Sequence, residues 1–174
     1  MDTVTSNGTM RRTISVMVEN KFGVLARIST LFAARGFNID SLAVGETEDP
    51  SVSRMTIVVS GNENVLEQVE KQLNKLIDVI KVNSFIEEAH LERDLALIKV
   101  KAEKSSRAEI FQIVDIFRAK VVDVGTDSLI IEITGDESKI TALESLLKPF
   151  GIKEMVRTGI IAMGRGSKKK ENGK

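Results

Sequence analysis

The chain has 174 residues, no cysteine, and equal numbers of basic and acidic side chains, 25 of each. The length fits one domain or two small ones. A formal net charge of zero argues against nucleic acid as the main partner, because neutralising phosphates requires a surplus of basic residues. Without cysteine the chain has no disulfide and no thiolate metal site, which fits a reducing compartment.

Residues 1–10 are small and polar, and we predict that they form a flexible leader. They lack the basic start and the apolar run of a signal peptide. No apolar run in the chain approaches the roughly 18 residues that a membrane span requires. We therefore expect a cytoplasmic protein with no membrane partner.

The first half of the chain switches between the two-residue period of strands and the 3.6-residue period of amphipathic helices. Strand patterns cover residues 13–19, 37–47, 52–60 and about 79–86. One helix pattern covers about residues 24–35, and a second begins at Asn62 and continues to Leu76. The predicted order is βαββαβ.

The same order follows a charged linker at residues 88–93. Strands are predicted at 95–101, 121–125, 128–134 and within 153–163, and helices at 106–117 and 136–147. The sequence therefore predicts an α+β fold of two ferredoxin-like βαββαβ domains in tandem. Their expected limits are residues 11–87 and 94–164, followed by a disordered tail at 165–174.

The start of the first helix differs from the others in its capping residues. Residues 23–26, Gly-Val-Leu-Ala, offer no side chain that accepts a hydrogen bond, so backbone N–H groups there are a candidate receptor for a carboxylate. We expect Ser106 and Glu109 to form a capping box in the second half. Asn62 and Asp136 are the expected caps of the other two helices.

Two plainer interpretations of this region stay open. Asn20 could itself cap a helix that begins one residue later, and Gly23 could be a turn residue that needs a positive φ. The amide of Asn38 could bind a ligand's ammonium or carboxylate group, or it could stabilise a turn. In the second half Val121 aligns with Asn38, and the loop at 103–106 has no glycine. Only the first domain is therefore predicted to bind a ligand.

Four segments in order carry a family resemblance: 20–25 (NKFGVL), 35–39 (RGFNI), 47–50 (TEDP) and 53–57 (SRMTI). They resemble the ACT domain, a small ligand-binding module of amino-acid metabolism. More closely, they resemble the regulatory (small) subunit of acetolactate synthase, also called acetohydroxyacid synthase. The likeness covers about residues 11–166 and is most distinctive in the N-terminal half.

The resemblance implies that two copies form a homodimer through their ACT-domain sheets and bind the effector valine at the interface. By position, the effector site would consist of Asn20, Gly23, Val24 and Leu25 of one chain and Asn38 and Ile39 of its partner. The valine carboxylate would meet the N–H groups of residues 23–25, and its ammonium would meet carbonyl and asparagine oxygens.

The resemblance also implies a division of labour between two subunits. The second domain, 94–164, would help to bind and activate a large catalytic subunit. That subunit would carry thiamine diphosphate, Mg²⁺ and FAD, and would convert two pyruvates into 2-acetolactate and CO₂ in branched-chain amino-acid biosynthesis. This chain itself would have no catalytic residue and no cofactor.

Three other functions agree less well with the sequence. An independent enzyme has no cysteine nucleophile to use, and His90 stands alone in a charged connector. Glu46, Glu48 and Asp49 form an acidic cluster that suits a solvated hairpin tip better than a cation site. An RNA-binding protein of this fold would need aromatic residues on its strands, which carry mainly aliphatic ones. Only the family resemblance argues against an ACT protein that serves a different enzyme.

Overall fold

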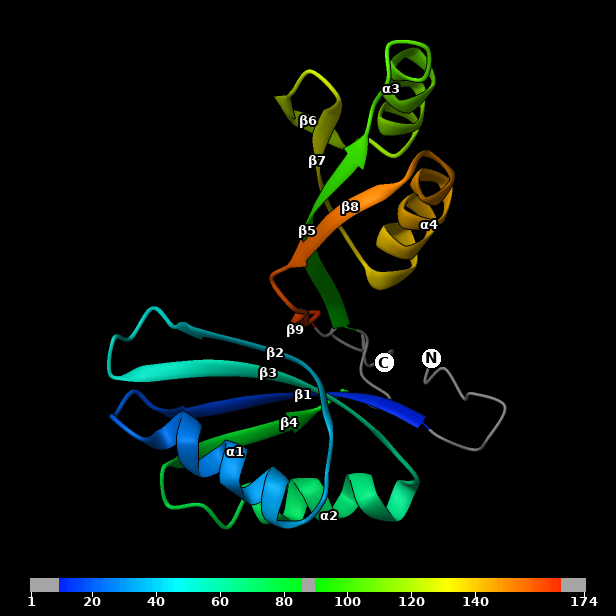
Figure 1. Ribbon diagram of the computed structural model, residues 1–174. Coiled ribbons are helices and arrows are strands. Elements are labelled where there is room, and N and C mark those ends of the chain that lie inside the picture. Colours follow the sequence, from blue (N-terminus) through cyan, green and yellow to red (C-terminus); the bar gives the residue numbers. More distant parts are fainter. Residues whose placement is uncertain (1–9, 86–89, 167–174) are drawn as a thin grey trace, which may run out of the picture. The chain divides into compact units, whose positions relative to one another are not determined.

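The computed structural model describes residues 10–85 and 90–166, and it contains two compact units (Figure 1). Of the described residues, one unit comprises 10–85, 90–91 and 162–166, and the other comprises Glu92–Ile161. Each unit has the element order βαββαβ. The predicted α+β fold of two ferredoxin-like units is confirmed.

The first unit is a four-stranded antiparallel sheet in the order β2-β3-β1-β4, with two helices on one face (Figure 1). Its elements are β1 (Met10–Glu19), α1 (Val24–Ala34), β2 (Ile39–Glu46), β3 (Val52–Gly61), α2 (Glu63–Leu73) and β4 (Val79–Ser84). Every predicted element is present. Helix α1 is placed by its connection from the central strand β1 to the edge strand β2.

The apolar faces of the strands and of the helices pack together in the core of this unit. Alternate residues of β1, Ile14, Val16 and Val18, are buried beneath the helices. Helix α1 contributes Ile28 and Phe32, which lie four residues apart and therefore on one face. Burial of such side chains is the main favourable contribution to folding.

The second unit repeats this plan, with a main sheet in the order β6-β7-β5-β8. Its elements are β5 (His90–Lys101), α3 (Arg107–Ile116), β6 (Lys120–Val124), β7 (Ser128–Gly135), α4 (Glu137–Leu147), the short 3₁₀ helix η1 (Lys148–Phe150) and β8 (Ile152–Arg157). A separate core lies between this sheet and its helices, with Ile98, Ile131 and Ile140 completely buried. In the described part of the chain, no helix is long and apolar enough to cross a membrane.

Two boundaries differ from the predicted ones. Strand β5 begins at His90, inside the range predicted as linker, because its first residues find a pairing strand in β9 (Ile161–Gly164). The stretch 153–163 contains two strands, not one, and Gly159 with φ 87° lies between them. The N–H of Ala162 donates to Thr56 Oγ1 at 3.4 Å, so residues from 162 onward group with the first unit.

The second unit also contains a buried ion pair that the sequence did not reveal. Asp94 has a side chain only 1% exposed, and Arg157 donates to its Oδ2 from Nε at 2.6 Å. The hydroxyl of Thr158 donates to the other carboxylate oxygen at 2.9 Å. Both acceptor oxygens of the buried carboxylate are thereby satisfied, which a buried charge requires.

Replacing Asp94 by alanine should lower the free energy of unfolding of the second unit by about 3 kcal/mol, because it leaves Arg157 without its buried partner. The value belongs to the lower end of the usual range, since Arg157 keeps 33% of its side chain exposed. Urea unfolding followed by circular dichroism measures the change. The control is Glu103→Ala, which removes an exposed pair with Lys101 and should leave the midpoint unchanged. Equal effects of the two substitutions would contradict the prediction.

Candidate functional site

The candidate site begins at the turn between β1 and α1, where Gly23 is the N-cap residue of the helix. Its φ of 84° is in the left-handed region that favours glycine. No side chain forms a hydrogen bond at this cap, and the first turn has no acidic residue. A Cβ placed on Gly23 would meet nothing within 4 Å, so the space beside the backbone is open.

Asn20 does not cap the helix, and that alternative is wrong. Its side-chain amide instead donates to Glu46 Oε1 at 3.0 Å and to the carbonyl oxygen of Pro50 at 2.9 Å. Its backbone N–H donates to the carbonyl of Ser51 at 2.7 Å. Asn20 therefore ties the loop before α1 to the hairpin between β2 and β3, and its amide oxygen stays available as an acceptor.

The first turn of α1 has backbone donors without intrahelical partners. The first helical bond runs from the N–H of Arg27 to the carbonyl of Gly23 at 3.0 Å. The N–H of Val24 reaches only the carbonyl of Lys21, at 3.4 Å. The N–H groups of Leu25 and Ala26 are left as donors at the positive end of the helix dipole, an arrangement that suits a carboxylate.

Two other helix starts are closed by side chains, as predicted. Asn62 Oδ1 accepts from the N–H of Val65 at 3.0 Å at the start of α2. Asp136 Oδ1 accepts from the N–H of Lys139 at 2.9 Å at the start of α4. The hydroxyl of Ser138 and the N–H of Lys139 hold the pKa of Asp136 below its ordinary value.

The predicted capping box at the start of α3 is wrong. Ser106 makes no side-chain cap bond; its hydroxyl donates backward to the carbonyl of Glu103 at 3.1 Å. The N–H of Arg107 takes the same carbonyl at 3.2 Å. This loop satisfies its own donors as a tight turn, so Glu109 has no backbone N–H to reach back to.

Protein groups also fill the space at the start of α3. The guanidinium of Arg107 donates to the carbonyls of Ala102 at 3.2 Å, Gly125 at 2.6 Å and Thr126 at 2.7 Å. The corresponding helix start in the first unit has no such side chain. The two units thus share a fold. The start of α3, like that of α1, has no side-chain cap, but it differs in having an acidic residue in its first turn, Glu109, and the bonded Arg107 side chain.

Asn38 and Ile39 follow the opposite end of α1. The helix has 11 residues, so about 16 Å of helix axis separates its two ends. Asn38 Nδ2 donates to Asp40 Oδ1 at 2.9 Å, and Asp40 Oδ2 accepts from the Ser60 hydroxyl at 2.5 Å. Within one chain, the structure does not bring Asn38 to Gly23.

The predicted site residues differ in what they expose. Val24 is only 3% exposed and Ile39 packs against the core, so both offer backbone rather than side chain to a ligand. Leu25 is 43% exposed and can contact one. Phe22, which is not among the predicted site residues, is fully exposed beside the open helix start. A phenylalanine within a short polar loop is the sequence feature that could have identified it.

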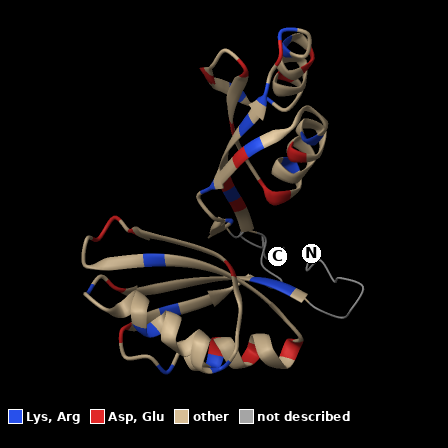
Figure 2. Cartoon of the chain, in the orientation of Figure 1, with Lys and Arg blue, Asp and Glu red and all other residues tan. Residues whose placement is uncertain are grey.

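Two acidic residues of the β2–β3 hairpin, Glu46 and Asp49, have structural partners. Glu46 accepts from Asn20, and Asp49 accepts from both the hydroxyl and the N–H of Ser51, which hold the pKa of Asp49 below its ordinary value. Among the described residues, no three histidine, cysteine or acidic side chains gather as metal ligands would. His90 stacks on Phe85 at 4.6 Å between ring centroids. Basic and acidic residues are interspersed along the chain (Figure 2).

Each half of the chain matches a known protein family. Residues 14–81 match the family described as "AHAS small subunit-like ACT domain", and residues 93–166 match "Small subunit of acetolactate synthase". The probable acetolactate synthase small subunit of Archaeoglobus fulgidus is 58% identical over 160 residues, which cover 92% of this chain and 100% of that protein. The acetolactate synthase small subunit of Mycolicibacterium smegmatis is 55% identical, with coverage of 92% and 95%.

A solved structure agrees with this assignment. The crystal structure of the acetolactate synthase small subunit from Thermotoga maritima has a TM-score of 0.81 to this chain and 46% sequence identity. The match covers 90% of this chain and 98% of that one. The fold and the N-terminal match define an ACT-domain protein with two tandem ferredoxin-like units. More specifically, the chain belongs to the acetolactate synthase small-subunit family, as the sequence resemblance predicted.

The difference between the helix starts can be measured. Asn62→Ala and Asp136→Ala should each lower the free energy of unfolding by about 1 kcal/mol, because each removes a side-chain cap. Ser106→Ala should lower the free energy of unfolding by clearly less, since the Ser106 hydroxyl caps no N–H group. Chemical unfolding of the three variants beside the unchanged chain provides the test. If Ser106→Ala lowered the free energy of unfolding as much as the other two substitutions, the side chain of Ser106 would be a cap after all.

Proposed function

We propose that this chain activates the catalytic subunit of acetolactate synthase in the cytoplasm and gives it feedback inhibition by valine. Membership of the small-subunit family supports the partner and the reaction. The open start of α1 supports a site for an amino-acid carboxylate in the first unit. That helix start is the single observation that carries the effector site.

The chemistry of valine fits the groups around this turn. Its carboxylate would accept hydrogen bonds from the N–H groups at the start of α1, behind the positive φ of Gly23. Its ammonium would donate to asparagine side-chain oxygens, which accept such bonds well. The exposed side chains of Leu25 and Phe22 would contact its apolar side chain.

Completion of this site would require a second copy of the chain. Asn38 and Ile39 lie about 16 Å along α1 from Gly23, too far to meet the same small ligand. Strand β2 is at the edge of its sheet, so its outer backbone groups can pair with another strand. A homodimer with the two sheets side by side would bring Asn38 of one chain to the helix start of the other.

The proposed role leaves catalysis to the partner. In this assignment the large subunit holds thiamine diphosphate, Mg²⁺ and FAD, and condenses two pyruvates to 2-acetolactate with loss of CO₂. The second unit, which has its own core, would bind and activate that subunit. Valine binding to the first unit would lower the activity of the catalytic subunit.

Valine binding should depend on Asn38. Asn38→Ala should weaken binding about tenfold or more, because it removes a hydrogen bond to a charged ligand group. Isothermal titration of the full chain with L-valine measures the affinity. Asn74→Ala is the matched control: Asn74 is also exposed, but it binds the carbonyl of Glu70 at the end of α2. Failure of the unchanged chain to bind valine, or equal affinities for both variants, would count against the effector site.

Activation should appear only when both subunits are present. Acetolactate formation by the catalytic subunit should rise on adding this chain, and valine should then lower it, whereas this chain alone should form none. A colorimetric acetolactate assay with each subunit alone and with both measures this. Acetolactate formation by this chain alone would contradict the proposal. Valine binding without any activation would instead indicate an ACT protein that serves another enzyme.

A further inference from the structure

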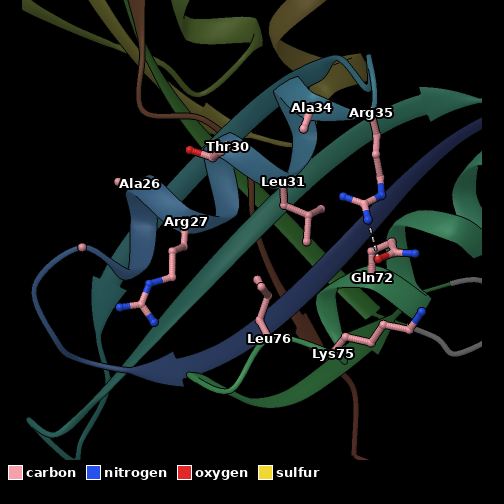
Figure 3. A pocket seen from close by; sticks show the side chains of 10 residues that line it. Ala26, Arg27, Thr30, Leu31, Ala34, Arg35, Gln72, Lys75 and Leu76 are labelled. Atoms are coloured by element: carbon pink, nitrogen blue, oxygen red, sulfur yellow. Dashed lines mark hydrogen bonds between the residues drawn. The ribbon is translucent and has the colours of Figure 1, made fainter.

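A hollow between α1 and α2 lies on the outer face of the helix layer of the first unit (Figure 3). Its volume is about 460 Å³, which suits a small organic molecule. Ten residues line it: Gly23, Ala26, Arg27, Thr30, Leu31, Ala34, Arg35, Gln72, Lys75 and Leu76. Gly23 and Ala26 also belong, through their backbone, to the valine site proposed above, and no part of the hollow requires a second chain.

The lining has one sign of charge. Arg27, Arg35 and Lys75 are basic, and none of the ten lining residues is acidic. Arg27 forms an ion pair with Asp78 through one terminal nitrogen. Arg35 donates to the neutral amide oxygen of Gln72 at 2.9 Å, as drawn in Figure 3. Within the described residues, neither Arg35 nor Lys75 has a carboxylate within ion-pair distance.

The floor of the hollow is apolar. Leu31 of α1 and Leu76 after α2 extend toward one another in Figure 3, between the basic side chains. Ala26 and Ala34 leave space on the α1 side of the hollow, because their side chains are single methyl groups. A ligand can therefore bury an apolar body against the floor while its anionic group meets the basic rim.

We propose that this hollow binds a small carboxylate that has an apolar body and no amino group. The basic side chains supply donors for the carboxylate. No side-chain carboxylate in the lining can accept from an ammonium, and the positive charges of Arg35 and Lys75 repel one. The same chemistry that favours a simple carboxylate therefore disfavours a free amino acid.

Three compounds with nearly the same carbon skeleton test this selectivity. The probe is 3-methylbutanoate, its neutral counterpart is 3-methylbutanamide, and L-valine adds an amino group to the probe. Two-dimensional NMR titration of the full chain, with the backbone amides assigned, measures binding. Only 3-methylbutanoate should shift the amides of residues 26–35 and 72–76 together, and added salt should weaken it. Inorganic phosphate in a parallel titration separates recognition of any anion from recognition of the apolar carboxylate.

Substitutions of exposed residues link binding to the charges. The double variant Arg35→Gln with Lys75→Gln should weaken 3-methylbutanoate binding about threefold to tenfold, because each exposed charge contributes modestly. Lys71→Gln should leave it within about twofold, since Lys71 is paired with Glu67 on α2 and does not line the hollow. All these positions are exposed, and thermal unfolding confirms that the variants fold.

Several results would overturn the proposal. They are absence of binding by 3-methylbutanoate, equal binding of its amide, and unchanged binding in the double variant. If phosphate binds equally well, the apolar floor has no role and the proposal is likewise wrong. If the double variant lost only its affinity for the catalytic subunit, the hollow would be a protein contact. Asn38→Ala should leave this binding unchanged, so the test is independent of the valine site.

Discussion

The left-handed backbone at Gly23 is the constraint on which the first unit depends. It turns the chain sharply after β1, so that α1 begins at Val24 and directs Val24, Ile28 and Phe32 into the core. A residue with a side chain would be strained at this φ. A glycine also cannot cap the helix with a side chain, and this costs about a few tenths of a kcal/mol relative to a capping residue. The same residue therefore sets the packing of α1 and leaves its start open.

The loop that holds this turn is kept in place by contacts from a distant part of the sequence. Asn20 is bonded to Glu46 and Pro50, so the β2–β3 hairpin supports the approach to α1. Both amide hydrogens of Asn20 are used there, which leaves its oxygen as an acceptor. Asn20 is thus a positioning residue for the helix start. Spacing along the chain could not reveal this, because the contacts cross 26 and 30 residues.

The sequence predicted the elements well because burial enforces their periods. The alternating apolar residues of β1 and the four-residue spacing in α1 both face the core in the structure, although Thr13 and Ser15 on the other face of β1 are buried as well. The misses come from tertiary contacts that compete with local patterns. Ser106 and Glu109 have the spacing of a capping box, yet a tight turn at Glu103 satisfies the donors first. Strand β5 begins early because β9, far along the chain, pairs with it.

The residues of the proposed effector site lie in two separate places within one chain, and the length of α1 is the reason. Gly23 and Asn38 lie at opposite ends of one helix, so neither can complete the other's site within a chain. In a two-fold symmetric pair, each helix start would meet the far helix end of its partner, and two equivalent sites would form together. A ligand that binds only the paired form stabilises it by mass action. Effector binding and assembly would then be one equilibrium, and the catalytic subunit could respond to valine through the pairing of the small subunits.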